Sequence, residues 1–513
     1  MSVFSSLFRL ARTGTTFART GALDVALEAT DAPRSVRIAA KVAFWPWRWL
    51  GLRGDRSLPP VVRAITALGP SYIKFGQILS TRPDVTGDDL AAELRMLQDS
   101  LPPFPQAVAE AEIAAEFGKP VAELFSSFSE PVAAASIAQV HRARVAATGE
   151  EVAVKVRRPG IAKAFRKDID AFYLVARVIE FLAPKARRLK PREVIAHFDG
   201  VVQAELDFRM EAGAAAEFAS NTEDDAGFTV PRVVWNLSAE RVLTLGWVEG
   251  TAMGDPAALA TAGVDLDEMG ARVIQSFLRH ALRDGFFHAD MHQGNLKVAP
   301  NGDLVAFDFG IMGRIDPYTR RVYAEILYGF LRKDYKRVAE VHFEAGYVPA
   351  DRDVHAFAQA LRSVAEPIFG QDATHISMAR LLAHLFDVTE QFGMETRTDL
   401  ILLQRTMVVV EGVARSLSPS INMWTVAQPV VEDYIRESIG PRAVVRDLAE
   451  TVKILSRFGP LLPHMAEDLL IRRNQPAAPV EIRNGPGPWI WGVVGAAAGA
   501  ALAALGVLVG LGF

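Results

Sequence analysis

Two short polar stretches near the middle of the chain carry the residue types of a phosphoryl-transfer site. The first is His-Ala-Asp-Met-His-Gln-Gly-Asn at residues 288–295, and the second is Asp-Phe-Gly at residues 308–310. A carboxylate five positions before an asparagine, followed by an Asp-Phe-Gly triplet, is the layout of the catalytic and metal-binding loops of kinases. The sequence therefore makes phosphoryl transfer the leading hypothesis.

This layout gives each polar group a role. Asp290 occupies the position of the catalytic-loop carboxylate, Asn295 that of the metal-binding amide, and Asp308 that of the carboxylate that binds the main magnesium ion. Their hard oxygen atoms suit Mg²⁺. A rival interpretation takes His288, Asp290 and His292 as ligands of zinc or iron. It leaves Asn295 and the Asp-Phe-Gly triplet unexplained.

A lysine and the loop before it stand where a kinase holds nucleotide phosphates. Lys155 ends a Val-Ala-Val-Lys segment, which is close to the signature of the lysine that pairs with phosphates and with a helix carboxylate. The preceding stretch, residues 131–139, is rich in alanine and has no glycine. Alanine penalises positive φ and keeps the backbone farther from a phosphate, so we expect ATP in an altered geometry, and ordinary protein phosphorylation is disfavoured. The expected nucleotide contacts are Ala133, Ala134, Ala135, Ser136, Ile137, Ala138, Gln139, Val140, Lys155 and Glu249.

The elements that must position these groups change in character along the chain. In order, the patterns predict helices over 59–125, short strands from 132 with segments at 139–145 and 152–156, helices over 161–218 broken at Pro184 and Pro191, a strand at 241–247, a helix at 265–282, a strand at 304–306 and helices over 318–470. Short β segments followed by helices predict an α+β, bilobal protein-kinase-like fold with a helical N-terminal extension.

The C-terminal end differs from the middle. Residues 484–513 contain no charge, and residues 489–513 are long enough, at about 1.5 Å per residue, to cross a hydrocarbon core of roughly 30 Å. This predicts one transmembrane helix; the alternative is a buried helix of a soluble protein. Arg472, Arg473 and Arg483 precede the segment and place the globular part in the cytoplasm. Two Gly-x-x-x-Gly spacings leave homo-oligomerisation open.

The N-terminal end is basic and aromatic. The first 23 residues have three arginines and no acidic residue, and Phe4, Leu7, Phe8 and Ala11 share one helical face. An interfacial amphipathic helix and an organellar transit peptide explain this pattern equally well. The aromatic cluster at 44–49, Phe-Trp-Pro-Trp-Arg-Trp, suits either a membrane interface or aromatic packing near its proline.

Composition excludes several classes of function. In a chain of 513 residues, 56 Lys and Arg nearly balance 60 Asp and Glu, so no global positive field recruits nucleic acid. Half of the residues are hydrophobic, which is enough for several cores. With no cysteine, disulfides, thiol nucleophiles, iron–sulfur clusters and Cys-containing zinc sites are excluded.

Over about residues 60–320, the chain resembles the UbiB/ADCK family of atypical kinases. Lys-Phe-Gly-Gln at 74–77 matches the KxGQ motif of that family, and the alanine-rich loop replaces the glycine loop. Glu205-Leu206-Asp207 matches its ExD motif, with Glu211 six residues beyond Glu205. One position departs from the family: Gln293 stands where the family has proline, which loosens the loop.

The resemblance implies further site residues. Glu211 corresponds to the helix glutamate that pairs with Lys155, and Asp207 joins the metal ligands. In the family, the KxGQ extension folds over the active site, which implies a contact between Lys74 and Glu205. A site covered in this way would be closed to protein substrates.

The function that the resemblance implies is a membrane-anchored atypical kinase-like ATPase, dependent on ATP and Mg²⁺, that is required for or regulates the biosynthesis of ubiquinone or another prenyl lipid. The implied partners are ATP and ADP, membrane lipid, prenylated phenol intermediates and other quinone biosynthesis enzymes. The implied location is the inner (plasma) membrane of a bacterium. Two alternatives stay open: a nucleotide-regulated lipid-binding scaffold, and a small-molecule kinase, which would not explain the KxGQ motif.

These expectations combine into one scheme of segments. It comprises a membrane-proximal N-terminal segment (1–58), the helical KxGQ extension (59–125), a kinase-like N-lobe (126–250), a helical C-lobe (251–474), a linker (475–488) and the transmembrane helix (489–513).

Overall fold

The computed structural model describes residues 3–29, 45–80, 88–94, 96–97, 102–182, 191–369, 391–394 and 398–438, with isolated positions between them. The described residues form two compact units. The first unit contains those through Met210 together with Val234–Gly246, and the second contains Glu211–Val233 and those from Trp247 onward. The expected linker at 475–488 and transmembrane helix at 489–513 lie outside the described residues. Within the described ranges, no helix has both the length and the apolar character needed to cross a bilayer.

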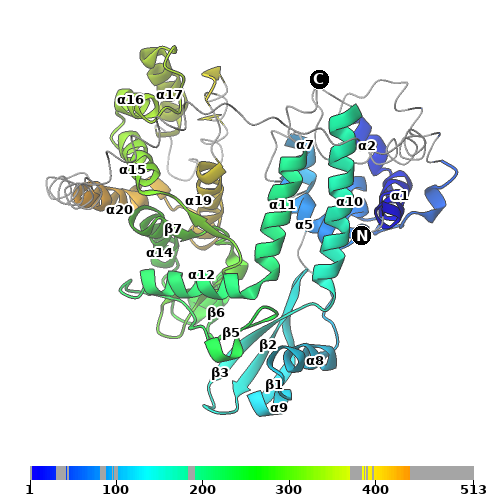
Figure 1. The fold of residues 1–513 in the computed structure, drawn as a ribbon. Helices are drawn as coiled ribbons and strands as arrows, with labels where there is room; N and C mark the ends of the chain where they lie inside the picture. The colour runs from blue at the N-terminus through cyan, green and yellow to red at the C-terminus, as the bar shows by residue number, and fades with distance from the viewer. Residues whose placement is uncertain are drawn as a thin grey trace, which may run out of the picture. The chain divides into compact units, whose positions relative to one another are not determined.

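The first unit contains an antiparallel sheet of four strands in the order β1-β2-β3-β5 (Figure 1). The strands are β1 (Phe125–Ala134), β2 (Ala138–Val145), β3 (Glu151–Arg157) and β5 (Val242–Gly246). Val152, Val154 and Val156 of β3 are fully buried, as a strand with one face on a core requires. This core also takes in Ile113 of α8 (Gln106–Phe117).

The predicted strands of this sheet are confirmed, but β1 begins earlier than expected. The alanine pattern placed the change to β structure at Val132, whereas the strand starts at Phe125. Phe125 is buried and pairs with Val145, and the register shifts three times along β1. These irregularities hide the strand's alternation from a reading of the sequence, because cross-strand packing decides the structure there.

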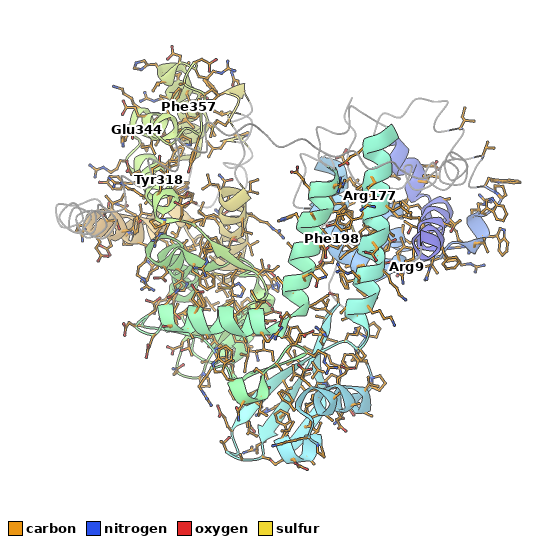
Figure 2. All side chains as sticks on the ribbon, in the orientation of Figure 1. Arg9, Arg177, Phe198, Tyr318, Glu344 and Phe357 are labelled. Carbon is orange, nitrogen blue, oxygen red and sulfur yellow. The ribbon has the colours of Figure 1, made fainter. Side chains whose placement is uncertain are left out.

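Helices make up the rest of the first unit. They are α1 (Val3–Thr20), α2 (Ala22–Ala29), the 3-10 turn η1 (Arg48–Leu50), α4 (Pro60–Leu68), α5 (Pro70–Ser80), α7 (Asp88–Leu94), α8, α9 (Val121–Leu124), α10 (Ile161–Leu182) and α11 (Pro191–Leu206). Three of them begin at a proline, whose fixed φ suits a first helical position. The helices α10 and α11 lie side by side (Figure 1). Figure 2 shows Phe198 of α11 between these two helices, where its ring meets Phe172 and Phe75.

The second unit joins small sheets to a helical part. A four-stranded sheet has the order β4-β9-β8-β6, and β7 pairs with β10. The strands are β4 (Phe228–Thr229), β6 (Thr251–Ala252), β7 (Phe286–His288), β8 (Leu296–Val298), β9 (Leu304–Ala306) and β10 (Met312–Arg314). The helices are α12 (Phe208–Asn221, whose first turn belongs to the first unit), α13 (Pro256–Thr261), α14 (Leu266–Arg279), α15 (Pro317–Leu331), α16 (Tyr335–Glu344), α17 (Val354–Phe369), α19 (Thr398–Leu417) and α20 (Met423–Ser438). The predicted strand at 304–306 is confirmed, and so are helices in the described parts of residues 318–438; the remainder of the predicted helical stretch, to residue 470, lies outside the described residues.

Candidate nucleotide- and metal-binding site

The two polar stretches lie at the same end of the β8–β9 hairpin. The first ends directly before β8, and the second begins shortly after β9. Leu296 of β8 pairs with Ala306 of β9, and the Phe307 N–H donates a hydrogen bond of 3.1 Å to the Asn295 carbonyl oxygen. Asn295 therefore comes directly before one strand and Asp308 two residues after its partner. Antiparallel pairing brings the two predicted metal ligands to the same end of the hairpin.

Asp308 has a backbone conformation that is rare for a residue with a side chain. Its φ is 66°, and among the described non-glycine residues only Lys333 shares a positive φ. Such a conformation costs on the order of 1–3 kcal/mol and is typical of functional sites. The neighbouring Phe309 is buried against Phe218 and His288, whereas Asp308 is exposed. The strained residue thus follows a strand and precedes a buried phenyl ring, and its exposed carboxylate accepts a hydrogen bond of 3.3 Å from the Gly310 N–H at Oδ1.

The side chain of Asn295 is oriented by a hydrogen bond to the backbone. Its Nδ2 donates a hydrogen bond of 3.0 Å to the carbonyl oxygen of Asp290. Because this contact uses the amide nitrogen, Oδ1 is the atom of this side chain that would bind a cation. Together with the carboxylate of Asp308, this gives two hard oxygen donors, which fit a magnesium ion.

His288 binds the backbone around the predicted catalytic loop through both of its ring nitrogens. It is fully buried, and burial lowers the pKa of its imidazole, so the ring is neutral. Nδ1 accepts a hydrogen bond of 3.2 Å from the Asp290 N–H, and Nε2 lies 3.4 Å from the Phe307 carbonyl oxygen, which assigns the proton to Nε2. Neither nitrogen has a lone pair left for zinc or iron. Among the residues that the structure describes, no group of three His, Asp or Glu side chains could hold a metal ion, so the rival site is not supported.

Asp290 lies on a well-supported loop. Its side chain is about one-third exposed, and Oδ2 lies 3.7 Å from Nε2 of His292. The preceding carbonyl oxygen, that of Ala289, accepts a hydrogen bond of 3.1 Å from the Thr406 hydroxyl of α19. This contact could not be predicted from the sequence, because Thr406 is more than a hundred residues away and lies in an ordinary helical pattern.

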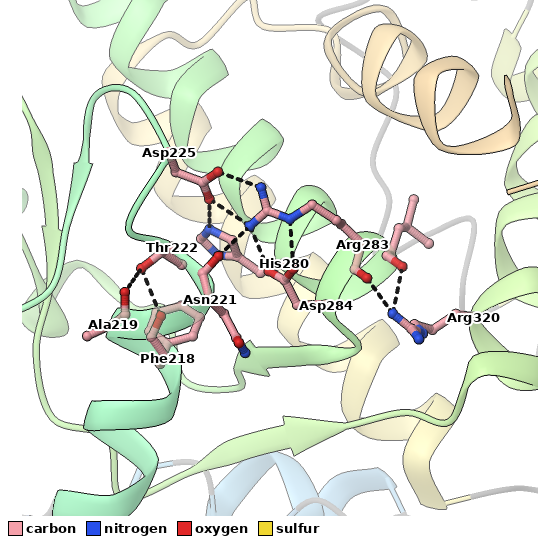
Figure 3. A network of polar contacts seen from close by, with 10 residues as sticks. Phe218, Ala219, Asn221, Thr222, Asp225, His280, Arg283, Asp284 and Arg320 are labelled. Atoms are coloured by element: carbon pink, nitrogen blue, oxygen red, sulfur yellow. Dashed lines mark hydrogen bonds and ion pairs between the residues drawn. The ribbon is translucent and has the colours of Figure 1, made fainter. Parts of the chain in front are cut away.

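A polar network around the buried side chains of Asp225 and His280 supports the segment that leads to this loop (Figure 3). Asp225 accepts hydrogen bonds from His280 Nε2 at 3.0 Å and from Arg283 Nη1 at 2.6 Å. These partners outweigh burial and hold the pKa of the Asp225 carboxyl well below its ordinary value. His280 and Arg283 belong to a π-helical turn, His280–Asp284, directly before β7. The network therefore ties the segment after α12 to the strand that leads into the catalytic loop, and sequence reasoning missed it.

In the first unit, the predicted contact between Lys74 and Glu205 is confirmed. Lys74 Nζ lies 2.6 Å from Glu205 Oε1, and both side chains are largely buried. The lysine is on α5 and the glutamate is near the end of α11. The KxGQ and ExD motifs therefore meet through an ion pair.

The other residues of the KxGQ segment pack or form hydrogen bonds within the first unit. Phe75 is buried between Phe172 and Phe198, with ring centroids 5.1 and 5.0 Å away. A Cβ at Gly76 would lie 2.5 Å from Leu97 Cδ1, so the Leu97 side chain would have to shift to admit one. Gln77 Nε2 donates a hydrogen bond of 3.3 Å to the Leu97 carbonyl oxygen. The motif thus sets the position of α5 as well as that of its lysine.

Asp207, predicted as a metal ligand, binds an arginine in this structure. Arg209 Nε lies 2.8 Å from Oδ1 of Asp207, and Nη2 lies 2.7 Å from Oδ2. The hydrogen bond from Arg209 is the main cause that lowers the pKa of Asp207. A cation at this carboxylate would have to displace a bidentate guanidinium contact.

Lys155 lies on β3, directly opposite Val140 of β2. Its Nζ is 5.6 Å from the centroid of the Phe208 ring, at the start of α12. Glu211 is buried one helical turn beyond Phe208. Because Lys155 and Glu211 belong to different units, their pairing stays a prediction.

The alanine-rich loop is a tight connection between β1 and β2. Ala134 pairs with Gln139, and the Ala135 N–H donates a hydrogen bond of 2.8 Å to the Ala138 carbonyl oxygen. No residue of this loop has a positive φ, so the loop closes without glycine. Ala133 is exposed, Ala134, Ala135 and Val140 are half-buried, and the rest of the loop, Ser136, Ile137, Ala138 and Gln139, is buried.

Gln139 has a structural role inside the first unit. Its Oε1 accepts a hydrogen bond of 2.9 Å from the Phe104 N–H, and its Nε2 donates one of 3.2 Å to the Phe104 carbonyl oxygen. Nε2 also lies 2.9 Å from His141 Nε2. The fully buried amide thus fastens the end of the N-terminal extension to β2.

Glu249 lies after β5 and is exposed. Its Oε1 accepts a hydrogen bond of 3.0 Å from Trp247 Nε1. The ammonium of Lys297, on β8, lies between the Trp247 and Phe307 rings, 5.4 and 5.6 Å from their centroids. Lys297 joins the Glu249 segment to the residue before Asp308, and sequence reasoning did not single it out.

Comparisons with known proteins agree with this geometry. The ABC1 atypical kinase-like domain matches residues 96–342, and the UbiB helical domain matches residues 361–422. The Probable protein kinase UbiB of Marinobacter nauticus is 38% identical over 470 residues, which cover 90% of this chain and 85% of that protein. The protein of the same name from Pseudomonas fluorescens is 39% identical over 451 residues, covering 86% and 83%. A solved structure of Rv3197 with erythromycin from Mycobacterium tuberculosis has a TM-score of 0.52 and 26% identity, over 69% of this chain and 90% of that one.

Fold, loops and comparisons together define an atypical kinase-like protein. The chain belongs to the UbiB family, which confirms the resemblance drawn from its motifs. Its role is that of an atypical kinase-like protein in ubiquinone biosynthesis, and nucleotide binding is consistent with the family.

Proposed function

We propose that this protein is a membrane-anchored, Mg²⁺-dependent ATPase that serves ubiquinone biosynthesis and does not phosphorylate proteins in trans. The observation that carries the proposal is the end of the β8–β9 hairpin, where Asn295 directly before β8 and a strained Asp308 just after β9 offer hard oxygen ligands. A strained, exposed carboxylate next to an oriented amide needs a functional reason, and a nucleotide-bound cation supplies one.

In this proposal, Asn295 and Asp308 hold Mg²⁺, which neutralises charge on the nucleotide phosphates. Asp290 orients the attacking group or accepts its proton. Lys155 binds the phosphates and pairs with Glu211; the position of Lys155 above Phe208, one turn before Glu211, supports this pairing. Asp207 is a third ligand if Arg209 releases it.

Two features of the first unit support a substrate other than protein. The alanine-rich loop has no glycine and no positive φ, so it cannot follow the phosphates as a glycine loop does. The ion pair between Lys74 and Glu205 holds the KxGQ helix in place. We propose that this extension restricts access for protein substrates and leaves nucleotide turnover to act on a prenylated phenol or another lipid.

The membrane part of the proposal rests on the sequence. Residues 489–513 carry no charge and have the length of a bilayer-spanning helix, and arginines precede them. The curated relatives named above are bacterial. The proposed location is therefore the inner membrane of a bacterium, with the catalytic part in the cytoplasm.

The test is quinone profiling of a deletion strain complemented with wild type, Asp308→Asn or Asp303→Asn. Asp303 lies at the opposite end of the same hairpin, where its carboxylate binds Thr229 and Asn301, so it is a matched control. We expect ubiquinone to be restored by wild type and Asp303→Asn and not by Asp308→Asn at equal protein levels. Full restoration by Asp308→Asn would contradict the ATPase assignment and support a scaffold.

A further inference from the structure

The first unit exposes a cluster of large apolar side chains beside α1. Trp45, Trp47, Trp49 and Leu50 are 68, 57, 66 and 53% exposed, and we refer to these four residues as the tryptophan surface. Phe8 of α1 is 74% exposed as well. Single exposed apolar residues are ordinary, but four within six positions indicate a surface that a membrane or another protein covers. Of the two interpretations that the sequence left open, internal aromatic packing does not hold for these residues.

The backbone of the tryptophan surface is fixed to α1. Arg19 Nη1 donates hydrogen bonds of 2.6 Å to the carbonyl oxygens of Trp49 and Gly51. The Leu52 N–H donates one of 3.1 Å to the Thr16 hydroxyl. At Gly51 a Cβ would lie 2.2 Å from the Thr15 carbonyl oxygen, so the chain touches the helix backbone there. The indoles are therefore presented by an ordered turn, and their exposure is built into the fold.

Positive charge surrounds the exposed indoles. Residues 45–58 contain three arginines, Arg48, Arg53 and Arg56, and all three are exposed. The same stretch has one acidic residue, Asp55, whose carboxylate binds the Ser57 N–H. An apolar centre with a basic rim complements an anionic, partly apolar partner.

We propose that the tryptophan surface docks onto an anionic lipid bilayer, with the indoles at the level of the headgroups. Indole rings prefer this zone because one edge is apolar and the N–H is polar, and arginines at its border bind lipid phosphates. A second copy of the chain is a poorer occupant, because two such surfaces would bring their arginines together. Lipid binding by this surface does not require nucleotide turnover. It shares with the proposed function only the location at a membrane.

The absence of cysteine from the sequence permits a direct test with the full chain. An environment-sensitive fluorophore is attached to the Trp47→Cys protein, which is then placed in vesicles of phosphatidylcholine and phosphatidylglycerol. The matched control is Trp235→Cys, since Trp235 is also 57% exposed but lies outside the tryptophan surface. We expect a blue-shifted emission that spin-labelled lipid quenches at position 47, and a water-like, unquenched emission at position 235. Equal, water-like signals at both positions would overturn the proposal.

Charge provides the second part of the test. In the Trp47→Cys background, Arg48→Glu with Arg53→Glu should reduce lipid binding of the labelled site by about fivefold for each arginine lost. Unchanged quenching, or equal quenching in vesicles of phosphatidylcholine alone, would overturn an anionic bilayer as the partner. A blue shift without vesicles that grows with protein concentration would instead show a second copy on this surface. Adding Asp308→Asn should leave the lipid signal intact. The lipid-docking proposal and the ATPase proposal can therefore be refuted independently of each other.

Discussion

Lys74 and Glu205 form an ion pair of 2.6 Å between α5 and α11, with side chains only 9 and 19% exposed. A largely buried ion pair is sensitive to the loss of either partner, because the remaining charge is left without compensation. The pair therefore links the KxGQ helix to the ExD motif in both geometry and stability.

Removing one member of this pair should destabilise the first unit strongly. We expect Lys74→Met or Glu205→Gln to lower the free energy of unfolding by about 3 kcal/mol, and the double variant to recover part of that loss. Urea unfolding followed by circular dichroism measures this. Arg436→Ala is the control, since the pair between Arg436 and Asp433 is exposed and contributes about 0.5 kcal/mol. A loss no larger than that of the control would show that the buried pair is unimportant.

The same pair allows a test of regulation. If the extension controls the nucleotide site, Lys74→Met should change nucleotide affinity in a sample that is still folded. Titration with a fluorescent nucleotide, at a temperature where circular dichroism shows a folded chain, reports this. An affinity equal to that of wild type, together with normal quinone levels, would contradict control by the extension.

Gly76 should resist even the smallest substitution. Its Cβ would clash with Leu97 Cδ1 at 2.5 Å and press on Ile65 Cδ1 at 3.2 Å, whereas a Cβ at Gly200 of α11 would meet nothing within 4 Å. We therefore expect Gly76→Ala to be less stable than Gly200→Ala by about 1–3 kcal/mol. Thermal unfolding of the two proteins side by side gives the difference. Equal midpoints would mean that α5 has room at this position.

Because Asp308 has a positive φ, we expect its glycine variant to be more stable than its alanine variant, which is the reverse of the usual order. At most positions alanine is at least as stable as glycine, but at a φ of 66° the Cβ of alanine carries the strain. Asp308→Gly should therefore be more stable than Asp308→Ala by roughly 1 kcal/mol, although both lose the metal ligand. At Asp303 the order should reverse. If alanine were the more stable residue at both positions, the strained conformation would be wrong.

Stability should fall as the pH drops from 7 to 5, in part through His280. Burial lowers the pKa of His280, although Asp225 opposes this, and His280 Nδ1 is buried without a hydrogen-bond partner. The unfolded chain therefore takes up a proton below about pH 6.5 and the folded chain does so at lower pH, so the folded state loses up to about 1.4 kcal/mol per pH unit. Asp225, whose pKa is lowered from its ordinary value, stays ionised in both states above pH 5.

His280→Gln should reduce this pH dependence, although the variant is less stable at pH 7. The exposed His355 serves as the comparison, because His355→Gln makes the same substitution at a position outside the core. Urea midpoints at pH 7, 6 and 5 check both expectations. A slope that is the same in wild type and His280→Gln would show that the buried imidazole does not titrate as described.

Much of the fold could be predicted because its signals are local. The valines of β3 alternate, the prolines at 60, 70 and 191 start helices, and the Asp-Phe-Gly triplet keeps its spacing to Asn295. The short strands of two or three residues, such as β4 and β6, have no period to detect. Their formation depends on pairing with distant segments, and so does the early start of β1.

The supporting contacts of the site were beyond prediction for a related reason. Gln139 binds Phe104 across 35 positions, Asp225 binds His280 across 55, and Thr406 binds Ala289 across 117. None of these side chains differs locally from ordinary polar residues of strands or helices. Without the family resemblance, the contact between Lys74 and Glu205 could not have been predicted either.

The most direct test of the central claim is ATP hydrolysis by the purified full chain at varied Mg²⁺ concentration. We predict that Asp308→Asn lowers the Mg²⁺-dependent rate by about a hundredfold or more, while Asp303→Asn stays within about twofold of wild type. Circular dichroism must show that all three proteins are folded. A rate for Asp308→Asn equal to that of wild type would contradict the assignment of the β8–β9 hairpin as the metal site of an ATPase.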